Sequence, residues 1–425
     1  MNERPDGLDR AWTDLEAIVG REYVWPASAS DAIDGLQPAR IIAPRTAQEI
    51  AQVLQYCSAN GLGVIPRGGG TKMGFGNRPQ KADLILSTER LDRVIEHAWG
   101  DMTVIVEAGC TIENIQRTVG EHGQRLAADP LWPEKSTVGG LLATAESGTL
   151  RIRYGAVRDL VLGVEVALPD GSLIKAGGKV VKNVAGYDLT KLMIGSLGTL
   201  GVITRAVFRL HPLPAATASY SASLSSVDES VKLLLAILDS HLVYTGLQVR
   251  ADGPDHISVD VLTEGIPESL QDQYAKLSRI AVGHTFAESV SDPWKARQEL
   301  FADAGAAVIC KCSVLPSQMG SLCEVVFRHA KSAKVAATLV AQATGVAEVR
   351  LDAARPPSLA EALKNLRAEV DRLDGTLVVR LCPAPIKEAL DVWGSVKDAV
   401  PLMEQIKGKF DPARTLNPGR FVGAI

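Results

Sequence analysis

The sequence feature that most constrains this chain is the segment 66–76, PRGGGTKMGFG. Apolar residues, including Val64 and Ile65, precede three consecutive glycines, which predicts a strand that ends in a loop without Cβ atoms. The backbone of such a loop can take positive φ and direct several N–H groups at one anion. Because Arg67 and Lys72 flank the glycines, the segment is typical of a phosphate or pyrophosphate site, with a tight surface turn as the alternative.

The spacing of the glycines excludes two common phosphate loops. The chain contains no G-x-x-x-x-G-K-[ST] segment, and no G-x-G-x-x-G segment follows a predicted strand. Neither a P-loop nucleoside triphosphatase nor an ordinary dinucleotide-binding βαβ unit is therefore expected.

Length and charge limit the class of protein. With 425 residues the chain is too long for one ordinary core, so two domains are expected. The net charge of -4 and the pI near 6.0 argue against a protein that binds nucleic acid through general electrostatics. The sequence has no run of 18 apolar residues and no apolar stretch typical of a secretory signal at its start. A cytoplasmic protein without a transmembrane segment is expected.

The cysteines and histidines predict no metal site. Six cysteines are dispersed without a C-x-x-C spacing, which is typical of reduced thiols in a cytosolic compartment. The seven histidines form no H-x-H or H-E-x-x-H pair. Cys310 and Cys312 alternate within an apolar run and would share one face of a strand, so packing in a core is the favoured interpretation.

The first half of the chain carries several helix and strand signals. Thr46 and Glu49 form a T-x-x-E capping box before a helix with one apolar face, and Thr111 opens a second such helix. The segment 169–171, PDG, predicts the turn of a β-hairpin. The expected elements are helices at 11–19, 46–60, 111–119 and 188–194, and strands at 62–66, 83–87, 91–97, 103–107, 160–168, 172–175 and up to Leu210.

The segment 211–214, HPLP, predicts a domain boundary. Beyond it, helices are expected at 227–240, 266–280, 293–303, 317–342 and 358–373, and strands at 242–250, 256–262, 306–315, 346–352 and 376–382. This alternation predicts a separate α+β layer in which helices pack on an antiparallel sheet.

Five ordered segments carry a resemblance to a known family. They are PRGGGTKMGFG (66–76), STVGGLLATAESG (136–148), RIRYGAVRDLVLGVEVALPDG (151–171), VKNVAGYDLTKLMIGSLGTLGVIT (181–204) and FDPARTLNPGR (410–420). Together they resemble the vanillyl-alcohol-oxidase, or PCMH-type, family of FAD-binding flavoproteins, and within it the FAD-binding subunits of bacterial glycolate oxidases. The match runs from about residue 40 to 213 and returns at about 408 to 422.

The resemblance implies an α+β fold. A two-part PCMH-type FAD-binding domain would accompany an α+β cap domain with an antiparallel sheet. The implied boundaries are 1–40 for an N-terminal lead-in, 41–213 for the FAD-binding domain, 215–400 for the cap, and 401–425 for a C-terminal segment that returns to the FAD site.

The resemblance also implies which residues bind FAD. The glycine loop would surround the pyrophosphate, the segment 130–148 would follow the isoalloxazine ring and ribityl chain, and the segment 201–203 would contact the adenine side. The implied cofactor-binding residues are Pro66, Arg67, Gly68, Gly69, Gly70, Thr71, Lys72, Gly74, Pro130, Thr137, Val138, Gly139, Gly140, Thr144, Ser147, Gly148, Arg153, Tyr154, Gly155, Gly201, Val202, Ile203 and Asn417.

Three departures from the family pattern bear on the expected chemistry. Thr71 stands where members with covalent FAD often carry the linking histidine, so noncovalent FAD is expected. The H-G-D-G-N-x-H segment, which binds a divalent metal in relatives that oxidise 2-hydroxy acids, is absent. Leu197 replaces the glutamate that those relatives tend to carry in the G-S-E-G-T-L-G turn.

The resemblance leaves two functions open. In the first, this subunit oxidises glycolate or a related 2-hydroxy acid and passes electrons to a partner. Arg151, Arg153 and Arg158 are then the candidate carboxylate clamp, with a solvated or phosphate-facing basic patch as the alternative, and no base is identified. In the second, a flavin-bearing assembly subunit stabilises a catalytic paralogue. The expected partners are a catalytic flavoprotein paralogue and an iron–sulfur subunit, through which the protein would associate with a membrane.

Overall fold

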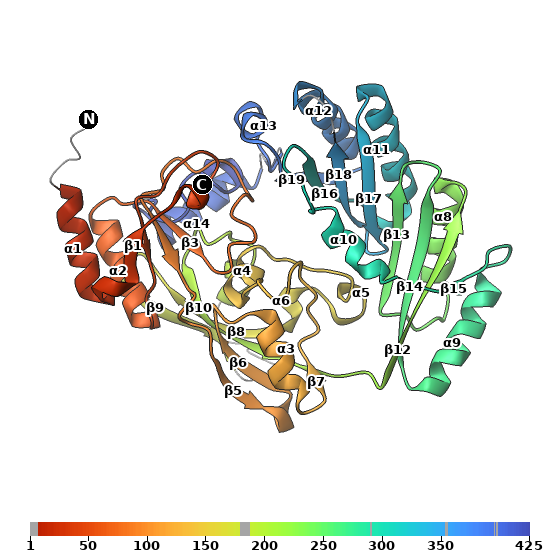
Figure 1. Ribbon diagram of the computed structural model, residues 1–425, viewed down its shortest axis with the longest axis horizontal. Helices are drawn as coiled ribbons and strands as arrows, with labels where there is room; N and C mark the ends of the chain where they lie inside the picture. The colour runs from red at the N-terminus through yellow and green to blue at the C-terminus, as the bar shows by residue number, and fades with distance from the viewer. Residues whose placement is uncertain (1–6, 179–187, 290, 353–355, 395, 397) are drawn as a thin grey trace. The chain divides into compact units, whose positions relative to one another are not determined.

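The computed structural model describes residues 7–178, 188–289, 291–352, 356–394, 396 and 398–425. The chain forms two compact units (Figure 1). The first comprises Met1–Ser147, Ala156–Pro212 and Ser395–Ile425, and the second comprises Gly148–Gly155 and Leu213–Gly394. The segment 148–155, which the resemblance assigns to the FAD-binding domain, thus groups with the second unit. Residues 181–187 of the fourth resemblance segment lie outside the described residues.

A four-stranded sheet forms part of the first unit, in the order β1 (Val24–Pro26), β2 (Arg40–Ile42), β4 (Leu84–Ser87) and β3 (Val64–Arg67). Strands β2, β4 and β3 are parallel, and β1 is antiparallel to β2. The helices α1 (Gly7–Val19) and α2 (Ala47–Ala59) share a core with this sheet. Thr46 caps α2 as predicted, because its Oγ1 accepts a hydrogen bond from N of Glu49 at 3.1 Å. The Glu49 carboxylate accepts a hydrogen bond from N of Arg45 at 2.7 Å. In a capping box it would accept from N of the next residue, Thr46.

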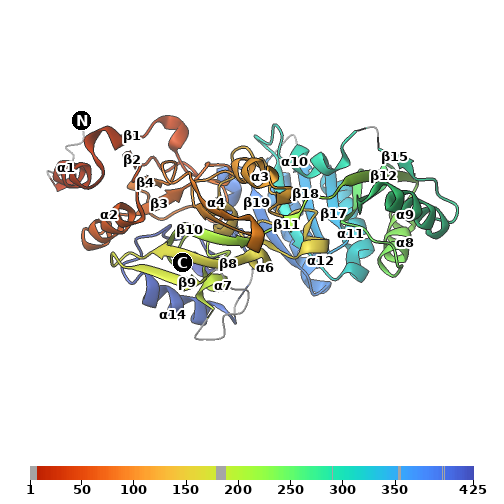
Figure 2. The ribbon, with the colours of Figure 1, turned by 90° about the horizontal axis from the view of Figure 1, so that it is seen from below.

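An antiparallel five-stranded sheet completes the framework of the first unit. Its order is β5 (Val94–Ala98), β6 (Thr103–Glu107), β10 (Val202–Arg209), β8 (Val161–Ala167) and β9 (Leu173–Gly177), and Figure 2 shows β8, β9 and β10 side by side. The pairing of β8 with β9 confirms the predicted hairpin. The other elements of this unit are α3 (Ile112–Gly120), α4 (Val138–Ala143), α6 (Val157–Leu160), α7 (Leu189–Met193), α14 (Val400–Phe410), β7 (Gln124–Arg125), β11 (His211–Pro212), η1 (Arg21–Tyr23), η2 (Ala29–Asp31), η3 (Trp99–Asp101) and η6 (Val422–Ala424).

The second unit is built on one antiparallel eight-stranded sheet. Its order is β15 (Ala287–Glu288), β12 (Ala216–Leu224), β14 (Ile257–Gly265), β13 (Gly246–Asp252), β17 (Ala336–Gln342), β18 (Val346–Asp352), β16 (Val308–Ser313) and β19 (Thr376–Leu381). The long helices are α8 (Val227–Leu238), α9 (Pro267–Ile280), α11 (Met319–Ala333) and α12 (Pro356–Arg372), and the short ones are α5 (Arg151–Tyr154), η4 (Pro293–Lys295), α10 (Ala296–Glu299), η5 (Pro316–Gln318) and α13 (Ala384–Ala389).

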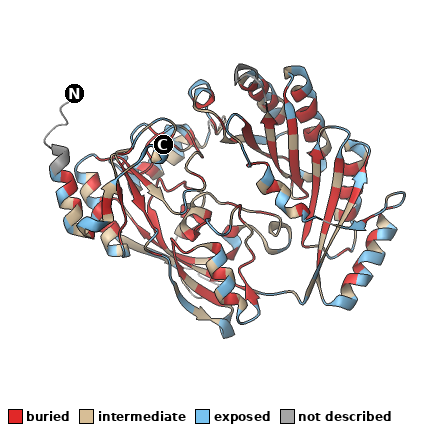
Figure 3. Cartoon of the chain, in the orientation of Figure 1, coloured by how far each residue is buried: buried red, intermediate tan, exposed pale blue. Residues whose placement is uncertain are grey.

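The long helices share a core with one face of this sheet. Alternate strand residues, such as Val249 and Val349, lie in that core with apolar side chains of the four helices. Figure 3 shows buried positions along the strands of this sheet and on the helices of the same unit. Cys310 and Cys312 are fully buried there, which confirms that they pack on one strand face. Because strand side chains alternate between faces, the intervening residues put polar groups such as Glu348 on the opposite face.

Two predicted elements of the second unit are wrong. The helix expected at 317–342 ends as α11 at Ala333, because Lys334 takes a left-handed conformation with φ 56°, and the remainder forms β17. The alternation of buried Ala337, Leu339 and Ala341 is the two-residue period of a strand. The helix expected at 293–303 is reduced to η4 and α10, and strand β12 was not predicted. No helix among the described residues is long and apolar enough to cross a bilayer.

Candidate cofactor site

The glycine loop leaves β3 and packs against the segment that leads into α4. A Cβ on Gly68 would lie 2.0 Å from Oγ1 of Thr137, and a Cβ on Gly69 would lie 1.7 Å from the carbonyl oxygen of Lys135. Positive φ, at 74°, occurs at Gly70. The three glycines therefore serve two needs: the first two allow close backbone packing, and the third allows the left-handed turn.

The C-terminal segment adds a further wall to this loop. Leu416 forms a parallel bridge with Val64, and N of Asn417 donates to the carbonyl of Val64 at 2.9 Å. Arg420 donates through Nη2 to the carbonyls of Met73 and Phe75, both at 2.6 Å. The last residues of the chain thus fix the loop that follows β3.

A tight turn at 195–201 forms the third wall. Leu197 takes φ 53°, which is unusual for a residue with a γ-branched side chain, and its backbone is held from two sides. Its N donates to the carbonyl of Ala143 at 2.8 Å, and its carbonyl accepts from Nδ2 of Asn417 at 2.6 Å. The α4 helix, this turn and the C-terminal segment are therefore joined by direct hydrogen bonds.

Ion pairs neutralise the two positive charges that the sequence predicts beside the glycine loop. Lys72 pairs with the buried Glu146, and Arg67 pairs with Asp31 at 2.6 Å. Burial would raise the pKa of Asp31, but hydrogen bonds from Ser28 and Arg67 hold it below its ordinary value.

Arg420 is the third cation at this loop. Its Nη1 donates to Oδ1 of Asn417 at 3.0 Å. Burial lowers the pKa of the Arg420 guanidinium to about 10. An arginine desolvated in this way gains from a nearby anion.

Two adjoining cavities, each about 70 Å³, lie between these walls. The expected cofactor residues that line them are Pro66, Arg67, Gly68, Gly69, Gly70, Thr71, Lys72, Thr137, Gly139, Gly140, Thr144, Gly201, Val202, Ile203 and Asn417. Gly74, Pro130, Val138 and Ser147 belong to the same unit but do not line these cavities.

Sequence reasoning missed part of the lining. The additional residues are Met73, Thr88, Ala143, Ser196, Leu197, Gly198 and Arg420. Arg420 could have been found, because it directly follows the turn-forming Asn417-Pro418-Gly419 at the end of the last resemblance segment.

The remaining expected residues belong to the second unit. Gly148, Arg153, Tyr154 and Gly155 lie in the second unit, where Oη of Tyr154 donates to Glu264 at 3.0 Å. Of the candidate clamp, Arg151 also lies in the second unit, Arg153 is exposed, and Arg158 is exposed on α6 of the first unit.

Arg151 is one of the charged groups of the second unit that act on Lys311 of β16. The electrostatic neighbours of Lys311 on β16 are Arg380, Glu348, Arg151 and Arg297. Sequence reasoning missed Lys311, Arg297 and Arg380, because strand pairing and helix placement bring together positions that are far apart in the chain.

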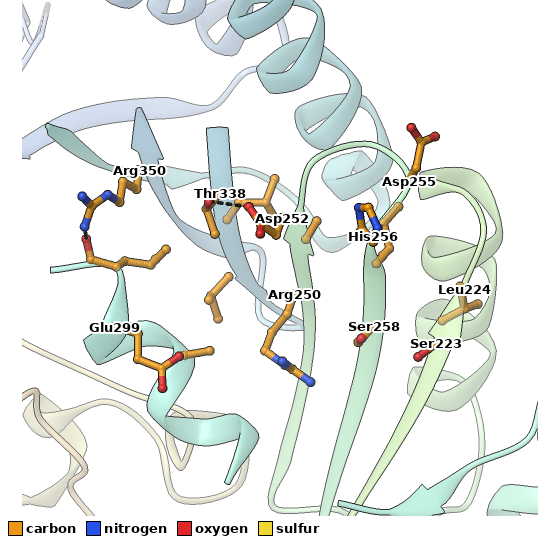
Figure 4. Close-up of a pocket in the computed structure, with 16 residues that line it drawn as sticks. Ser223, Leu224, Arg250, Asp252, Asp255, His256, Ser258, Glu299, Thr338 and Arg350 are labelled. Carbon is orange, nitrogen blue, oxygen red and sulfur yellow. Dashed lines mark hydrogen bonds between the residues drawn. The ribbon is translucent and has the colours of Figure 1, made fainter. Parts of the chain in front are cut away.

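A larger cavity of about 580 Å³ also lies in the second unit (Figure 4). Both arginines that line it are paired: Arg250 binds Asp260 through two hydrogen bonds of 2.6 and 2.9 Å, and Arg350 binds Asp352 at 2.7 and 2.9 Å. Figure 4 also shows Thr338 bonded to Asp252, at 3.0 Å. These pairs neutralise the two cations, so this cavity suits an anionic ligand poorly.

No cluster of three or more metal-ligating side chains occurs among the residues that the structure describes.

Comparison with known proteins indicates FAD binding in the first half of the chain. Residues 38–177 match the family model described as an FAD binding domain. Glycolate oxidase subunit GlcD of Bacillus subtilis is 32% identical over 232 residues, which cover 55% of this chain and 49% of that protein. The chain thus matches about half the length of this relative.

Two further likenesses extend over most of the chain. The mitochondrial D-lactate dehydrogenase (cytochrome) of Arabidopsis thaliana is 27% identical over 91% of this chain and 73% of its own length. A solved structure of p-cresol methylhydroxylase with substrate bound superposes with a TM-score of 0.81 at 15% identity, covering 98% of this chain and 97% of its own. The family match and this structural likeness confirm the predicted α+β, PCMH-type fold and FAD as the cofactor.

Proposed function

We propose, from the premise that the chain belongs to the superfamily of FAD-binding oxidoreductases, that it is the FAD-binding subunit of a complex that oxidises glycolate to glyoxylate. The observation that carries the proposal is the glycine loop, whose close packing excludes side chains at Gly68 and Gly69 and whose outer wall contains the desolvated Arg420. A backbone wall and a buried cation suit an anionic pyrophosphate. The residues present therefore fit FAD.

The cofactor would be held by the lining described above. Backbone N–H groups of the segment 68–72 and the Arg420 guanidinium would bind the pyrophosphate, and Asn417 would orient the turn at Leu197 that faces the same cavities. Because no linking histidine follows the glycines, the bound FAD would be noncovalent. When bound, FAD supplies a two-electron oxidant.

The substrate class follows from the relatives. Two of them carry names that specify glycolate and D-lactate, and both compounds are small 2-hydroxy acids. A carboxylate must be bound in either case, and an arginine guanidinium supplies fork-shaped donors for one.

Electrons would leave through partners. We propose a catalytic flavoprotein paralogue and an iron–sulfur subunit as those partners, since the relative from Bacillus subtilis is named as a subunit of glycolate oxidase. Leu197 favours a second candidate, a flavin-bearing assembly subunit that does not oxidise substrate itself. An aliphatic side chain there replaces the acidic group that catalytic relatives tend to carry.

Anaerobic stopped-flow absorbance separates the two functions. The purified, FAD-loaded protein is mixed with glycolate or D-lactate, and acetate serves as a carboxylate control without a hydroxyl group. Bleaching of the flavin by the hydroxy acids alone is expected for the oxidase subunit. Flavin that stays oxidised with every hydroxy acid would contradict this function and favour the assembly subunit.

A further inference from the structure

The wall of the glycine loop contains a buried ion pair. Lys72 follows the three glycines and pairs with Glu146, and the two side chains are 6% and 2% exposed. Lys72 lines the cavity beside the loop, and Glu146 belongs to the segment that follows α4. Both residues lie in the first unit. Each charge therefore depends on the other, because little water reaches either group.

Glu146 also joins the loop to the segment against which the glycines pack. Its Oε1 accepts a hydrogen bond from N of Leu131 at 2.8 Å. The carbonyl of Leu131 in turn accepts from Oγ of Ser136 at 2.6 Å. Ser136 directly precedes Thr137, the residue that a Cβ on Gly68 would meet. One carboxylate thus connects the lysine of the loop with the segment that supports the loop.

The backbone that carries Glu146 is fixed as well. Ala145 takes φ 46°, an unfavourable conformation for a residue with a Cβ, and N of Glu146 donates to the carbonyl of Leu141 at 3.2 Å. The same end of α4 accepts a hydrogen bond from N of Leu197 at the carbonyl of Ala143. The carboxylate is therefore held by its own backbone and by its partners, as expected of a group with a fixed position.

The pair decides how much charge the cavity offers to an anion. Arg67 lines the same cavity and is bound to Asp31 at 2.6 Å, just as Lys72 is bound to Glu146. Carboxylates thus cancel both cations that flank the glycines. The buried Arg420 and the backbone of the loop line the cavity too. Charges in a protein interior interact more strongly than in water, so the loss of either partner would leave a charge that strongly affects a bound pyrophosphate.

We propose that Glu146 is a positioning residue for FAD that acts through Lys72. Its carboxylate cancels the charge of the lysine and holds it in the cavity wall, so the pyrophosphate binds to the N–H groups of the loop and to Arg420 instead of the lysine ammonium. This role requires only that the chain binds FAD. It is the same in an oxidase subunit and in an assembly subunit, so it would stand even if glycolate failed to reduce the flavin.

Variants that remove one charge test this role through the dissociation constant of FAD. The full-length protein is freed of flavin and titrated with FAD, and quenching of the flavin fluorescence reports binding. Lys72→Met leaves a buried carboxylate that repels the pyrophosphate, so the dissociation constant should rise about tenfold to a hundredfold. Glu146→Gln keeps an oxygen that can accept from N of Leu131 but leaves the Lys72 charge without its carboxylate, so the dissociation constant should fall about tenfold.

The double variant separates a balance of charge from a purely structural role. Lys72→Met combined with Glu146→Gln removes both charges at similar volume, so the dissociation constant should return to within about threefold of that of the unmodified protein. A purely structural pair would weaken FAD binding in all three variants. Lys81→Met is the matched control, because it removes an exposed lysine of the same unit that pairs with Asp83 at 3.1 Å. It should change the dissociation constant by less than about twofold.

Salt dependence and thermal unfolding complete the test. Added salt should weaken FAD binding more steeply in Glu146→Gln than in the unmodified protein, because an uncancelled cation then faces the pyrophosphate. Thermal unfolding of the flavin-free proteins shows which variants fold, and the double variant decides the question if a single variant does not. Unchanged or lower affinity in Glu146→Gln would overturn the proposal. So would a double variant that binds FAD more than about threefold more weakly than the unmodified protein, because Lys72 itself would then contribute to binding.

Discussion

Lys407 and Asp411 form an almost fully buried ion pair, with Nζ and Oδ2 2.6 Å apart and side chains 1% and 0% exposed. Nζ of Lys407 also donates to the carbonyls of Thr199 at 2.7 Å and Leu416 at 3.0 Å. Asp411 accepts from N of Leu416 at 2.8 Å. Burial lowers the pKa of Lys407, and Asp411 opposes that change. The pair thus joins α14, the turn at 195–201 and the C-terminal segment at one point.

Lys407→Met should destabilise the first unit by about 3–5 kcal/mol, because it leaves Asp411 as a buried charge without its cation. It should also weaken FAD binding, since the segment that carries Asn417 loses its anchor. Urea unfolding and flavin fluorescence measure the two effects. Lys409→Met, an exposed position of the same helix, is the matched control and should change neither. Equal stability of the two variants would show that the pair does not hold the segment.

Local signals were enough to predict much of this fold. The Thr46 cap, the hairpin of β8 and β9, and the packing of Cys310 with Cys312 depend on residues close together in the chain, and the structure confirms them. The boundary between α11 and β17 depends on a left-handed Lys334, a conformation that no local residue pattern requires of lysine.

The candidate site was predicted only in part, because local sequence signals mark some of its residues and not others. Glycines mark the loop because only they permit the backbone contacts at Gly68 and Gly69. Arg420 acquires its role from burial and from contacts with Met73 and Phe75, which are remote in sequence. Such environments arise from strand pairing and from the return of the C-terminal segment to the glycine loop. The composition of the chain and the spacing of its motifs do not predict them.

Gly69→Ala should remove FAD at concentrations that saturate the unmodified protein. Even a methyl group would lie 1.7 Å from the carbonyl oxygen of Lys135, so the loop must move to accept it. The ratio of flavin to protein absorbance measures occupancy, and circular dichroism checks that the chain stays folded. Gly100→Ala is the matched control, because no atom lies within 4 Å of its Cβ position. Full occupancy in Gly69→Ala would show that the loop does not need the close packing seen here.

The FAD should be released by heat or acid into the supernatant. Thr71 occupies the position of the linking histidine, and a threonine hydroxyl is not the imidazole nucleophile that forms such a link. Precipitation of the yellow protein followed by absorbance of the supernatant at the flavin maximum measures the release. Flavin that stays with the denatured pellet would contradict noncovalent binding.

Arg420→Met should raise the dissociation constant of FAD by about tenfold to a hundredfold, because a charge-assisted hydrogen bond contributes about 1.5–3 kcal/mol. The guanidinium is buried beside the loop, so the pyrophosphate would accept a charge-assisted hydrogen bond from it away from bulk water. Arg420→Lys keeps the charge but loses the fork that reaches Met73 and Phe75, and an intermediate affinity is expected. Arg414→Met, which removes an exposed arginine of the same segment, is the control and should bind FAD normally.

The affinity for FAD should fall at high pH. Arg420 is protonated below its pKa of about 10, so affinity should stay constant between about pH 6 and 9 and fall as the pH rises through 10. That fall should be absent from Arg420→Met. Thermal unfolding of the FAD-free variants shows whether the loop itself has been lost. A variant that binds FAD as tightly as the unmodified chain would mean that Arg420 only supports the loop through its bonds to the carbonyls of Met73 and Phe75.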